Sequence, residues 1–317
     1  MSTPEYSRRM HRVLDHIDAN LSMPLDLDTL ADVAHFSRYH FHRVFSAWCG
    51  ETLGTYLRRR RLETAAILLS SGRQVSIFEL AIAVGFSSGE AFARAFKEHF
   101  GTTPSAWRTD APAKHAAALA AIKLRRQRNS NLDQANRNVD QSAIDSATHD
   151  VASFIPVHEA KMHVDIVQLP PVRVAYLRYI GPYGESLGTF WRETFFPWAA
   201  AHDLTAQTVY GVGHDNPDVT PPEKCRYDAC SEVPDDFVAS GAAGMMTLPG
   251  GKYALAGFRG TGATIGDAWV EMFRGWLPGS GYQCDARPCF ERYPVGARYD
   301  PATGEFDCEL CIPVRPL

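Results

Sequence analysis

Hydrophobic residues in the first hundred positions recur at helical spacing, and capping residues separate one apolar run from the next. Residues 5–20 predict a helix with one apolar face, formed by Met10, Val13, Leu14 and Ile17. The pattern predicts further helices over Leu27–Ala34, Arg38–Trp48, Leu53–Ser70, Ile77–Val84 and a segment ending near Phe100. Asp26 and Ser37 suit helix N-caps, and two pairs have capping-box spacing, Ser76 with Glu79 and Ser87 with Glu90. These elements predict an all-α first domain over residues 1–110.

One short pattern occurs twice in this domain, about fifty residues apart. The first copy contains Leu30-Ala31, Phe36-Ser37, Phe41, Arg43, Phe45 and Gly50. The second copy contains Leu80-Ala81, Phe86-Ser87, Phe92, Arg94, Phe96 and Gly101. Each copy predicts a helix, a tight turn and a second helix that carries an arginine, which is the arrangement of a helix-turn-helix. Two such units in tandem indicate a protein that contacts double-stranded DNA at two places.

The second helix of each unit is the one expected to read DNA. Such a helix lies in the major groove, where base edges offer donors, acceptors and the thymine methyl group. Arg43 and Arg94 occupy equivalent positions, and each can pair with a guanine or hold a phosphate. The helix between the units, Leu53–Ser70, should be about 27 Å long at ~1.5 Å per residue. The reading helices would then lie about 34 Å apart, one turn of duplex, with the DNA bent to meet both.

Three features of this domain leave alternatives open. The arginine run 58–61 either contacts phosphate or is solvated or paired with Glu63. Glu90 either faces a base or serves only as the capping-box acid. His40 either faces DNA or is a solvated helix residue.

Composition narrows the class of protein. The net charge is −4, but the acidic excess lies in residues 151–317, so the repeated motif and not the charge indicates DNA binding. No apolar run reaches the ~18 residues of a membrane span, and the basic N-terminus lacks a signal-peptide core, which together predict a cytoplasmic protein. Cys308 and Cys311 fall on opposite faces of a predicted strand, so we expect structural cysteines, no metal and no cofactor.

The chain changes character after residue 110. Residues 111–158 predict a linker, with a helix-compatible Ala-rich part over Lys114–Arg128 and a polar part over Asn129–Asp150. Residues 159–317 contain a second duplication, in which Leu169-Pro170 corresponds to Leu248-Pro249. Each half predicts strand, helix, strand, strand. We therefore expect a second, α+β domain with pseudo-twofold symmetry and a cleft between its halves.

Aromatic residues and one glutamate are the candidate chemistry of the second domain. The predicted helices of the two halves present Trp191, Phe195, Trp269 and Phe273 on their inner faces, and strand 288–293 puts Glu291 and Tyr293 on one face. A glutamate among aromatic rings suits a hydrophobic cation, through its charge and cation–π attraction. The alternatives are that the tryptophans form core and that Glu291 faces solvent.

Residues 8–108 resemble the DNA-binding domain of the AraC/XylS family of bacterial transcription regulators. The resemblance is carried by Ser37–Phe45, by the spacing of Tyr56, Arg60 and Ala65, and by Val84–Gly101 and Thr103–Arg108. It implies a seven-helix double helix-turn-helix that activates or represses transcription. The DNA contacts that it implies, together with the exposed cations beside them, are Arg38, Tyr39, His42, Arg43, Glu90, Ala91, Arg94 and Lys97. Gly89 departs from the pattern because it has no side chain to read a base.

Residues 160–317 resemble the gyrase-inhibitor-like ligand-binding domain. The resemblance is carried by Cys225–Val233, Gly250–Gly260, Trp269 to Leu277, Arg287–Tyr293 and Cys308–Val314. Similar domains in multidrug-responsive regulators bind lipophilic cations around a buried glutamate, which by position is Glu291. The implied ligand site comprises Trp191, Phe195, Tyr227, Trp269, Phe273, Glu291 and Tyr293. A reader domain followed by this domain is similar to the Rob type of regulator.

The expected function is therefore sequence-specific regulation of transcription, with double-stranded promoter DNA, a small hydrophobic or cationic effector and RNA polymerase as partners, and with no catalytic residues. Two alternatives assign the second domain other roles. It would be a small-molecule hydrolase that uses a Trp and a Glu, as some stand-alone domains of this fold do, or it would bind another protein.

Overall fold

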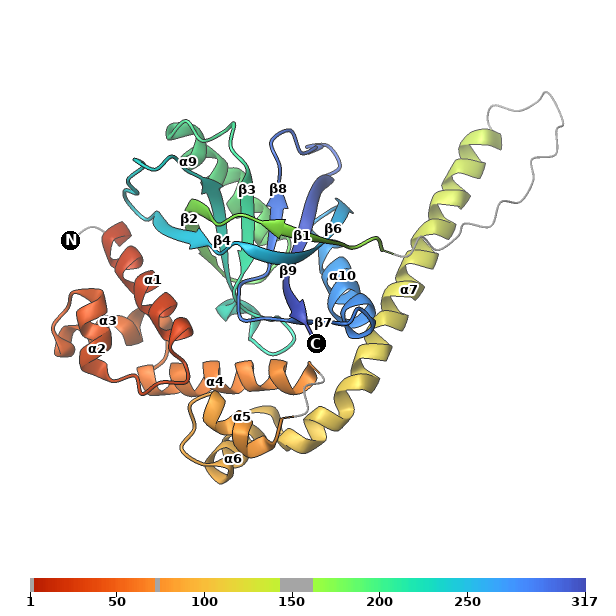
Figure 1. Ribbon diagram of the computed structural model, residues 1–317. Helices are drawn as coiled ribbons and strands as arrows, with labels where there is room; N and C mark the ends of the chain where they lie inside the picture. Colours follow the sequence, from red (N-terminus) through yellow and green to blue (C-terminus); the bar gives the residue numbers. More distant parts are fainter. Residues whose placement is uncertain (1–2, 72–74, 143–161) are drawn as a thin grey trace.

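The computed structural model describes residues 3–71, 75–142 and 162–317, and it places an all-helical part beside a sheet covered by helices (Figure 1). The helical part consists of α1 (Thr3–Ala19), α2 (Leu27–Ala34), α3 (Arg38–Cys49), α4 (Leu53–Ser70), α5 (Ile77–Ala83) and α6 (Gly89–Phe100), followed by α7 (Pro104–Ser142). The side chains of residues 3–4, of Tyr39 and of residues 125–142 lie outside the described set. Among the described residues, no helix is both long and apolar enough to cross a membrane.

Each helix-turn-helix unit has its own hydrophobic core. Phe41 and Phe45 of α3 are fully buried in the first core, and Phe92 and Phe96 of α6 are fully buried in the second. α4 contributes its N-terminal residues to the first core and its C-terminal residues to the second. Burying the phenylalanines on one side of each reading helix leaves the opposite side of that helix to solvent, as the repeated pattern predicts.

The predicted helix caps are confirmed at three starts and wrong at one. Asp26, Ser37 and the Ser76–Glu79 capping box begin α2, α3 and α5 as expected. The N-cap of α6 is Ser88 and not Ser87, because the Ser88 hydroxyl accepts the backbone N–H of Ala91. Glu90 is therefore one position too early to complete a capping box, and the alternative that it serves only as a capping acid is wrong.

α7 is longer than the sequence pattern indicated. It continues from Pro104 through residue 110 to Ser142, so the polar stretch expected as linker begins inside a helix, and only its part from residue 143 lies outside the described residues. Alanine favours helix, and Ile122 is almost fully buried where α7 passes the helices of the second domain. Tertiary contact thus supports a helix that composition left open. The division into domains at 1–110, 111–158 and 159–317 stays a prediction.

The second domain is built on one antiparallel sheet. Its strands are β1 (Asp165–Leu169), β2 (Val172–Ile180), β3 (Val209–Gly213), β4 (Arg226–Glu232), β5 (Gly244–Leu248), β6 (Gly251–Gly260), β7 (Tyr282–Cys284), β8 (Phe290–Tyr293) and β9 (Phe306–Pro316). One helical segment runs through α8 (Glu185–Phe190), η1 (Trp191–Phe195) and α9 (Phe196–Ala201), the other through α10 (Ile265–Val270), η3 (Glu271–Trp276) and η4 (Leu277–Gly279). A short turn of helix, η2 (Pro222–Lys224), precedes β4.

The strand order shows the predicted pseudo-twofold symmetry. Eight strands follow the order β1-β6-β9-β8-β3-β4-β2-β5, and β7 pairs with β9. Read outward from the central β8–β3 pair, one half has the order β3-β4-β2 and the other has the corresponding order β8-β9-β6. The symmetry axis therefore passes between β8 and β3. The predicted fold class is confirmed, with one addition: each half begins with an extra strand, β1 or β5, that pairs with the other half.

The two faces of the sheet have different surroundings. One face packs under the two helical segments, and the other carries a core that includes Val174, Tyr210 and Phe290. Cys308 lies in the first core and Cys311 in the second, so the two cysteines face opposite sides, as the strand pattern predicts. Among the described residues, no group of three or more His, Cys, Asp or Glu side chains could hold a metal ion.

Candidate DNA-reading helices and effector site

The reading helices present most of the expected contact residues to solvent. In α3, Arg38, His42 and Arg43 are exposed, and in α6 the exposed residues include Glu90, Ala91, Arg94 and Lys97. Arg38 lies 3.4 Å from Asp28 of the first helix of its unit, in an exposed ion pair. The side chain of Tyr39 is not among those described. The structure thus brings together on each reading helix the side chains that the sequence nominated, and their contacts with DNA stay a prediction.

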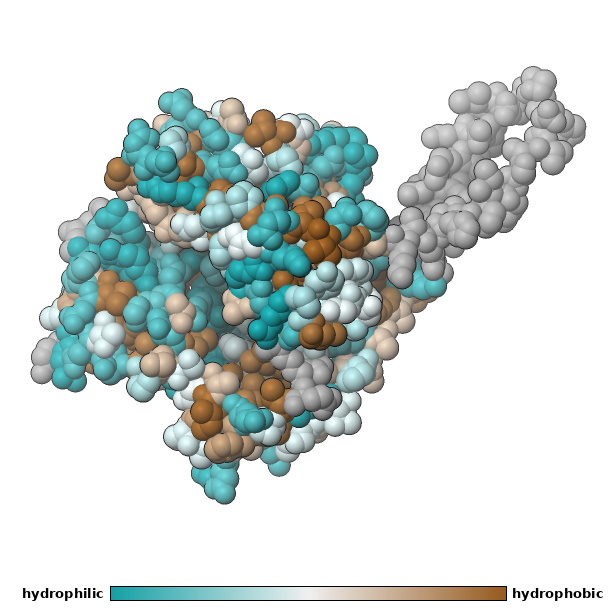
Figure 2. Space-filling view, viewed as in Figure 1, coloured by the Kyte–Doolittle hydropathy of each residue, from teal (hydrophilic) through white to brown (hydrophobic). Residues whose placement is uncertain are grey.

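Surface character differs between the two units. On the face shown in Figure 2, hydrophilic residues cover much of α1–α3, whereas hydrophobic residues gather at the α5–α6 end. Phe78 and Ile82 of α5 are exposed large hydrophobic residues. On this face the first unit is the more polar of the two, and weaker base reading by the second unit stays a prediction.

The arginine run on α4 does not serve as an open phosphate-binding patch. Arg59 and Arg60 are buried and each pairs with Glu63, at 3.0 Å in both cases. Arg61 donates to the backbone carbonyls of Leu21 and Met23. Arg58 pairs with Glu98 of α6 at the surface. The alternative of pairing with Glu63 is confirmed for the two central arginines, and phosphate contact by them is excluded.

Glu291 is buried at the centre of the second domain, next to the symmetry axis. One carboxylate oxygen accepts the hydroxyl of Tyr227 at 2.5 Å and that of Tyr293 at 2.9 Å, and the other accepts Trp269 Nε1 at 3.2 Å. Glu291 is 8% exposed, so the alternative that it faces solvent is wrong. The three donors come from β4, β8 and α10, and both halves of the domain therefore contribute to the site.

Burial sets the protonation of this cluster. Loss of water raises the pKa of Glu291, and the hydrogen bonds from Tyr227, Trp269 and Tyr293 oppose that rise without cancelling it. Burial, and then the neighbouring carboxyl, also raises the pKa of Tyr227 and Tyr293. The three donors on Glu291 are all neutral groups. The site thus holds a carboxyl group that has hydrogen bonds but no positive partner among the contacts described.

Aromatic rings enclose Glu291 from both halves. The Trp191 ring lies 6.1 Å from that of Tyr227 and 5.6 Å from that of Tyr293, and Trp269 stacks on Phe273 with centroids 5.8 Å apart. Phe273 is 36% exposed, whereas Phe195 is fully buried behind Trp191. Phe195 is part of the core, and Trp191 and Trp269 are partly buried and pack against the cores of their halves, so the alternative that the tryptophans form core stays open.

Two π-helical segments place these aromatic side chains. η1 begins at Trp191, and η3 follows the α-helical turn that carries Trp269 and includes Phe273. π-helical turns are rare and occur often at functional sites. Their presence at corresponding positions of the two halves marks the region around Glu291 as locally specialised.

Gly211 is a site residue that sequence reasoning missed. It pairs with Glu291 across β3 and β8, and a Cβ atom at this position would lie 1.7 Å from the Tyr227 hydroxyl and 2.6 Å from the Glu291 carboxylate. Only glycine leaves room for that hydrogen bond. The available signal was a glycine inside a strand, in Val209–Gly213, which often marks a close approach of other groups.

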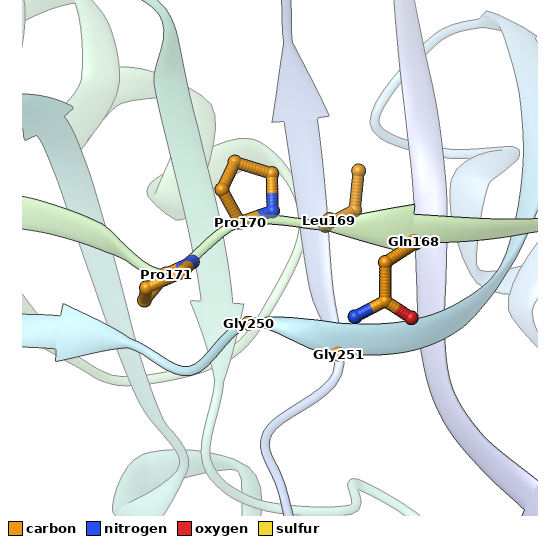
Figure 3. A pocket seen from close by; sticks show the side chains of 6 residues that line it. All are labelled: Gln168, Leu169, Pro170, Pro171, Gly250 and Gly251. Atoms are coloured by element: carbon orange, nitrogen blue, oxygen red, sulfur yellow. The ribbon is translucent and has the colours of Figure 1, made fainter.

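Two depressions of the domain lie away from Glu291. A shallow depression is formed where the corresponding Leu-Pro turns meet, with Gln168, Pro170 and Gly250 around it (Figure 3). Beside it is a cavity of about 100 Å³ lined in part by Phe290 and Arg292. These two residues flank Glu291 in β8 and face the opposite side of the sheet. Neither depression includes Glu291 or the aromatic rings around it among its lining residues.

Comparison with known proteins identifies both domains. Residues 30–110 match the family model of a helix-turn-helix domain, and residues 162–315 match that of the GyrI-like small molecule binding domain. A DNA gyrase inhibitor from Edwardsiella piscicida is 39% identical over 159 residues, which is 49% of this chain and 99% of that protein. The chain belongs to the GyrI-like family and joins this domain to an AraC-type helix-turn-helix domain.

The front half is similar to proteins named as transcription factors or regulators. The probable transcription factor PqrA of Proteus vulgaris is 43% identical over 84 residues, 26% of this chain and 68% of that protein. A solved AraC-type transcriptional regulator from Chromobacterium violaceum is 30% identical, covering 32% of this chain and 91% of that one, with a TM-score of 0.31. The two domains together make this chain a DNA-binding transcription regulator with a small-molecule-binding domain.

Proposed function

We propose that this regulator binds a small hydrophobic cation at Glu291 and that the bound cation changes its affinity for promoter DNA. The observation that carries the proposal is a buried carboxyl group surrounded by aromatic rings and held by neutral donors only. A cation bound beside Glu291 supplies the missing positive charge, and the rings of Trp191 and Trp269 add cation–π attraction.

Calorimetry with tetraphenylphosphonium tests the effector. Wild-type protein is expected to bind this cation and to bind triphenylphosphine oxide, a neutral compound of similar shape, more weakly. Glu291→Gln should lose the preference for the cation, whereas Glu193→Gln, an exposed change on η1, should leave binding as in wild type. Equal binding of the two compounds by wild type would contradict the proposal.

Binding should also depend on pH. Because burial raises the pKa of Glu291, the empty site holds a proton over a wider range of pH, and a bound cation favours the ionised carboxylate. Cation binding therefore releases a proton and should tighten as pH rises through the raised pKa. Calorimetry in buffers of different ionisation enthalpy measures that proton release.

For DNA, we propose that the exposed side chains of α3 supply most of the base reading. Arg43→Ala should weaken binding to a specific promoter by ~1–3 kcal/mol and relax preference at one base pair. Arg94→Ala should weaken binding to all sequences more evenly and reduce its salt dependence, because α6 is expected to hold mainly the backbone. Arg12→Ala, an exposed change on α1, is the control. Unchanged preference in the Arg43 variant would contradict the assignment.

The remaining parts of the proposal follow from that role. The protein acts in the cytoplasm, where promoter DNA lies, and contacts RNA polymerase to activate or repress transcription. Glu291 binds and does not catalyse. If wild type instead hydrolyses a reactive electrophile and Glu291→Gln abolishes that turnover, the second domain is a hydrolase.

A further inference from the structure

The sheet face opposite Glu291 carries the contact with the DNA-binding domain. Side chains of β4 alternate between the faces, so Tyr227 points to Glu291 while Arg226 and Asp228, its neighbours on either side, point the other way. In Figure 1, α1 and α4 lie beside this part of the sheet. The same strand therefore contacts the effector site with one residue and the DNA-binding domain with the two flanking residues.

Arg226 is the centre of one buried ionic cluster between the domains. Its guanidinium lies 2.7 Å from Asp18 of α1 and 2.8 Å from Asp215, which follows β3. Arg60 of α4 pairs with the same two carboxylates. Asp215 and Arg226 are almost fully buried. Burial acts to raise the pKa of Asp215, but Arg226 and Arg60 outweigh it and hold that pKa far below its usual range. All four side chains are thus charged and mutually paired.

A second cluster adjoins the first along α1. Arg178 of β2 has no exposed side-chain surface and pairs with Asp228 at 2.6 Å and with Asp15 of α1 at 2.8 Å. Asp15 also accepts the hydroxyl of Tyr176, at 2.9 Å. Asp228 contacts His214 at 2.7 Å. The flanking residues of Tyr227 on β4, Arg226 and Asp228, therefore each anchor one of the two clusters.

A third contact ties the same surface to the start of α4. Lys224 of η2 lies 2.8 Å from Glu51, and Glu51 pairs with Arg59 at 2.7 Å. The effector domain is thus paired with α1, which packs in the first helix-turn-helix unit, and with α4, which connects the two units. A change at this surface acts on the helices that set the relative position of the two reading helices.

We propose that an effector bound at Glu291 weakens the ion pairs of β4 with the DNA-binding domain, and that this contact transmits effector binding to the promoter. The inference rests on the proposed effector site. Tyr227 donates a hydrogen bond to Glu291, and the Trp191 ring lies 6.1 Å from the Tyr227 ring, so a ligand that takes the place of this hydrogen bond displaces Tyr227. Displacing Tyr227 moves the backbone between Arg226 and Asp228, and closely packed ion pairs tolerate little movement.

Asp18→Asn tests this route. The change keeps the shape of the side chain and removes the charge that pairs with Arg226 and Arg60, and the residue is distant in sequence from the effector site. Promoter affinity is measured by fluorescence anisotropy with and without saturating tetraphenylphosphonium. In wild type and in the exposed control Asp32→Asn, the ratio of the two dissociation constants should be about fivefold or more. In Asp18→Asn the ratio should fall to about one, with the cation still bound.

Each outcome distinguishes the interface from the effector site. If wild type gives no heat of binding with the cation, the proposed function itself fails. If the cation binds and Asp18→Asn keeps the wild-type ratio, the interface proposal alone is overturned, and the signal passes through α7, which also contacts η3. If Asp18→Asn does not fold, hydrogen exchange of wild type replaces it: the cation should speed exchange at residues 15–19 and 59–63, and unchanged exchange there overturns the proposal.

Discussion

The two faces of the effector-domain sheet bury the same functional group and give it opposite properties. On one face, burial raises the pKa of Glu291, whose hydrogen-bond donors are two tyrosines and a tryptophan. On the other face, burial acts in the same direction on Asp215 and Asp228, but arginines outweigh it and hold both pKa values below the usual range. Burial alone does not set the charge of a carboxyl group; its partners decide.

The difference in charged partners distinguishes a site that can bind a cation, at Glu291, from an interdomain contact whose carboxylates are already paired, at Asp215 and Asp228. Asp215 and Asp228 already have cations, so neither attracts another. Glu291 has neutral donors and aromatic neighbours, so it gains most from a cation that arrives from outside. Strand β4 connects the two environments, since Tyr227 faces one and Arg226 and Asp228 face the other.

Removing a buried ion pair on the sheet face opposite Glu291 should have the largest effect on stability. Asp228→Ala leaves Arg178 buried without its main partner and should lower the free energy of unfolding by ~3–5 kcal/mol. Urea denaturation measures the loss. Asp307→Ala removes an ion pair with the exposed Arg259 and should change stability little. Equal losses in the two variants would show that the buried face is no more than a surface contact.

Adding a methyl group beside Tyr227 and Glu291 should have the next largest effect on stability. Gly211→Ala places a methyl group against the Tyr227 hydroxyl and should cost ~1–3 kcal/mol while weakening cation binding. Gly257→Ala in β6 is the matched control, because a Cβ atom there meets no atom within 4 Å. The account fails here if Gly211→Ala binds the cation as tightly as the control does.

The raised pKa of Glu291 predicts a specific pH dependence of stability. A carboxyl group with a raised folded pKa stabilises fully below its unfolded value of 4.5 and loses that contribution as pH rises through the folded pKa. The stability of wild type relative to Glu291→Gln should therefore fall as pH increases above 4.5. Denaturation curves of both proteins at several pH values provide the comparison, and a difference that does not change with pH would contradict it.

His11 of α1 gives a second test of pH-dependent stability, at acid pH and on the helix that pairs with the effector domain. Burial, and then Arg178, lowers the pKa of His11 from 6.5 to about 3. The unfolded chain then binds more protons between those values, so stability is lost as pH falls from 6.5 towards 3. His11→Leu should lose less stability over this range than wild type, whereas the exposed His163→Leu should behave as wild type. Parallel acid profiles for all three proteins would refute the assignment.

Local patterns predicted most of the helical domain. Caps and apolar spacing act within a few residues, so the helix starts at Asp26, Ser37 and Ser76 followed from the sequence. The start of α6 was predicted one residue too early, because Ser87 precedes a second serine, Ser88, which accepts the backbone N–H of Ala91. The length of α7 was not predicted, because α7 contacts the effector domain and composition alone does not reveal that contact.

Features that depend on pairing between residues far apart in the chain could not be predicted from the sequence. β1 and β5 each pair with the other half of the domain, so neither half shows them by its own repeat. Gly211 matters only because Tyr227 and Glu291 meet above it. The ion pairs of Arg226 with Asp18 and of Lys224 with Glu51 join residues from different domains, and a charge pattern read along the chain contains no information about them.

The most direct test of the central claim is promoter affinity measured with and without tetraphenylphosphonium in wild type and in Glu291→Gln. The account predicts that the cation changes the dissociation constant of wild type by about fivefold or more and that of Glu291→Gln hardly at all. An equal change in both proteins, or none in a wild type that binds the cation, would contradict an effector response through Glu291.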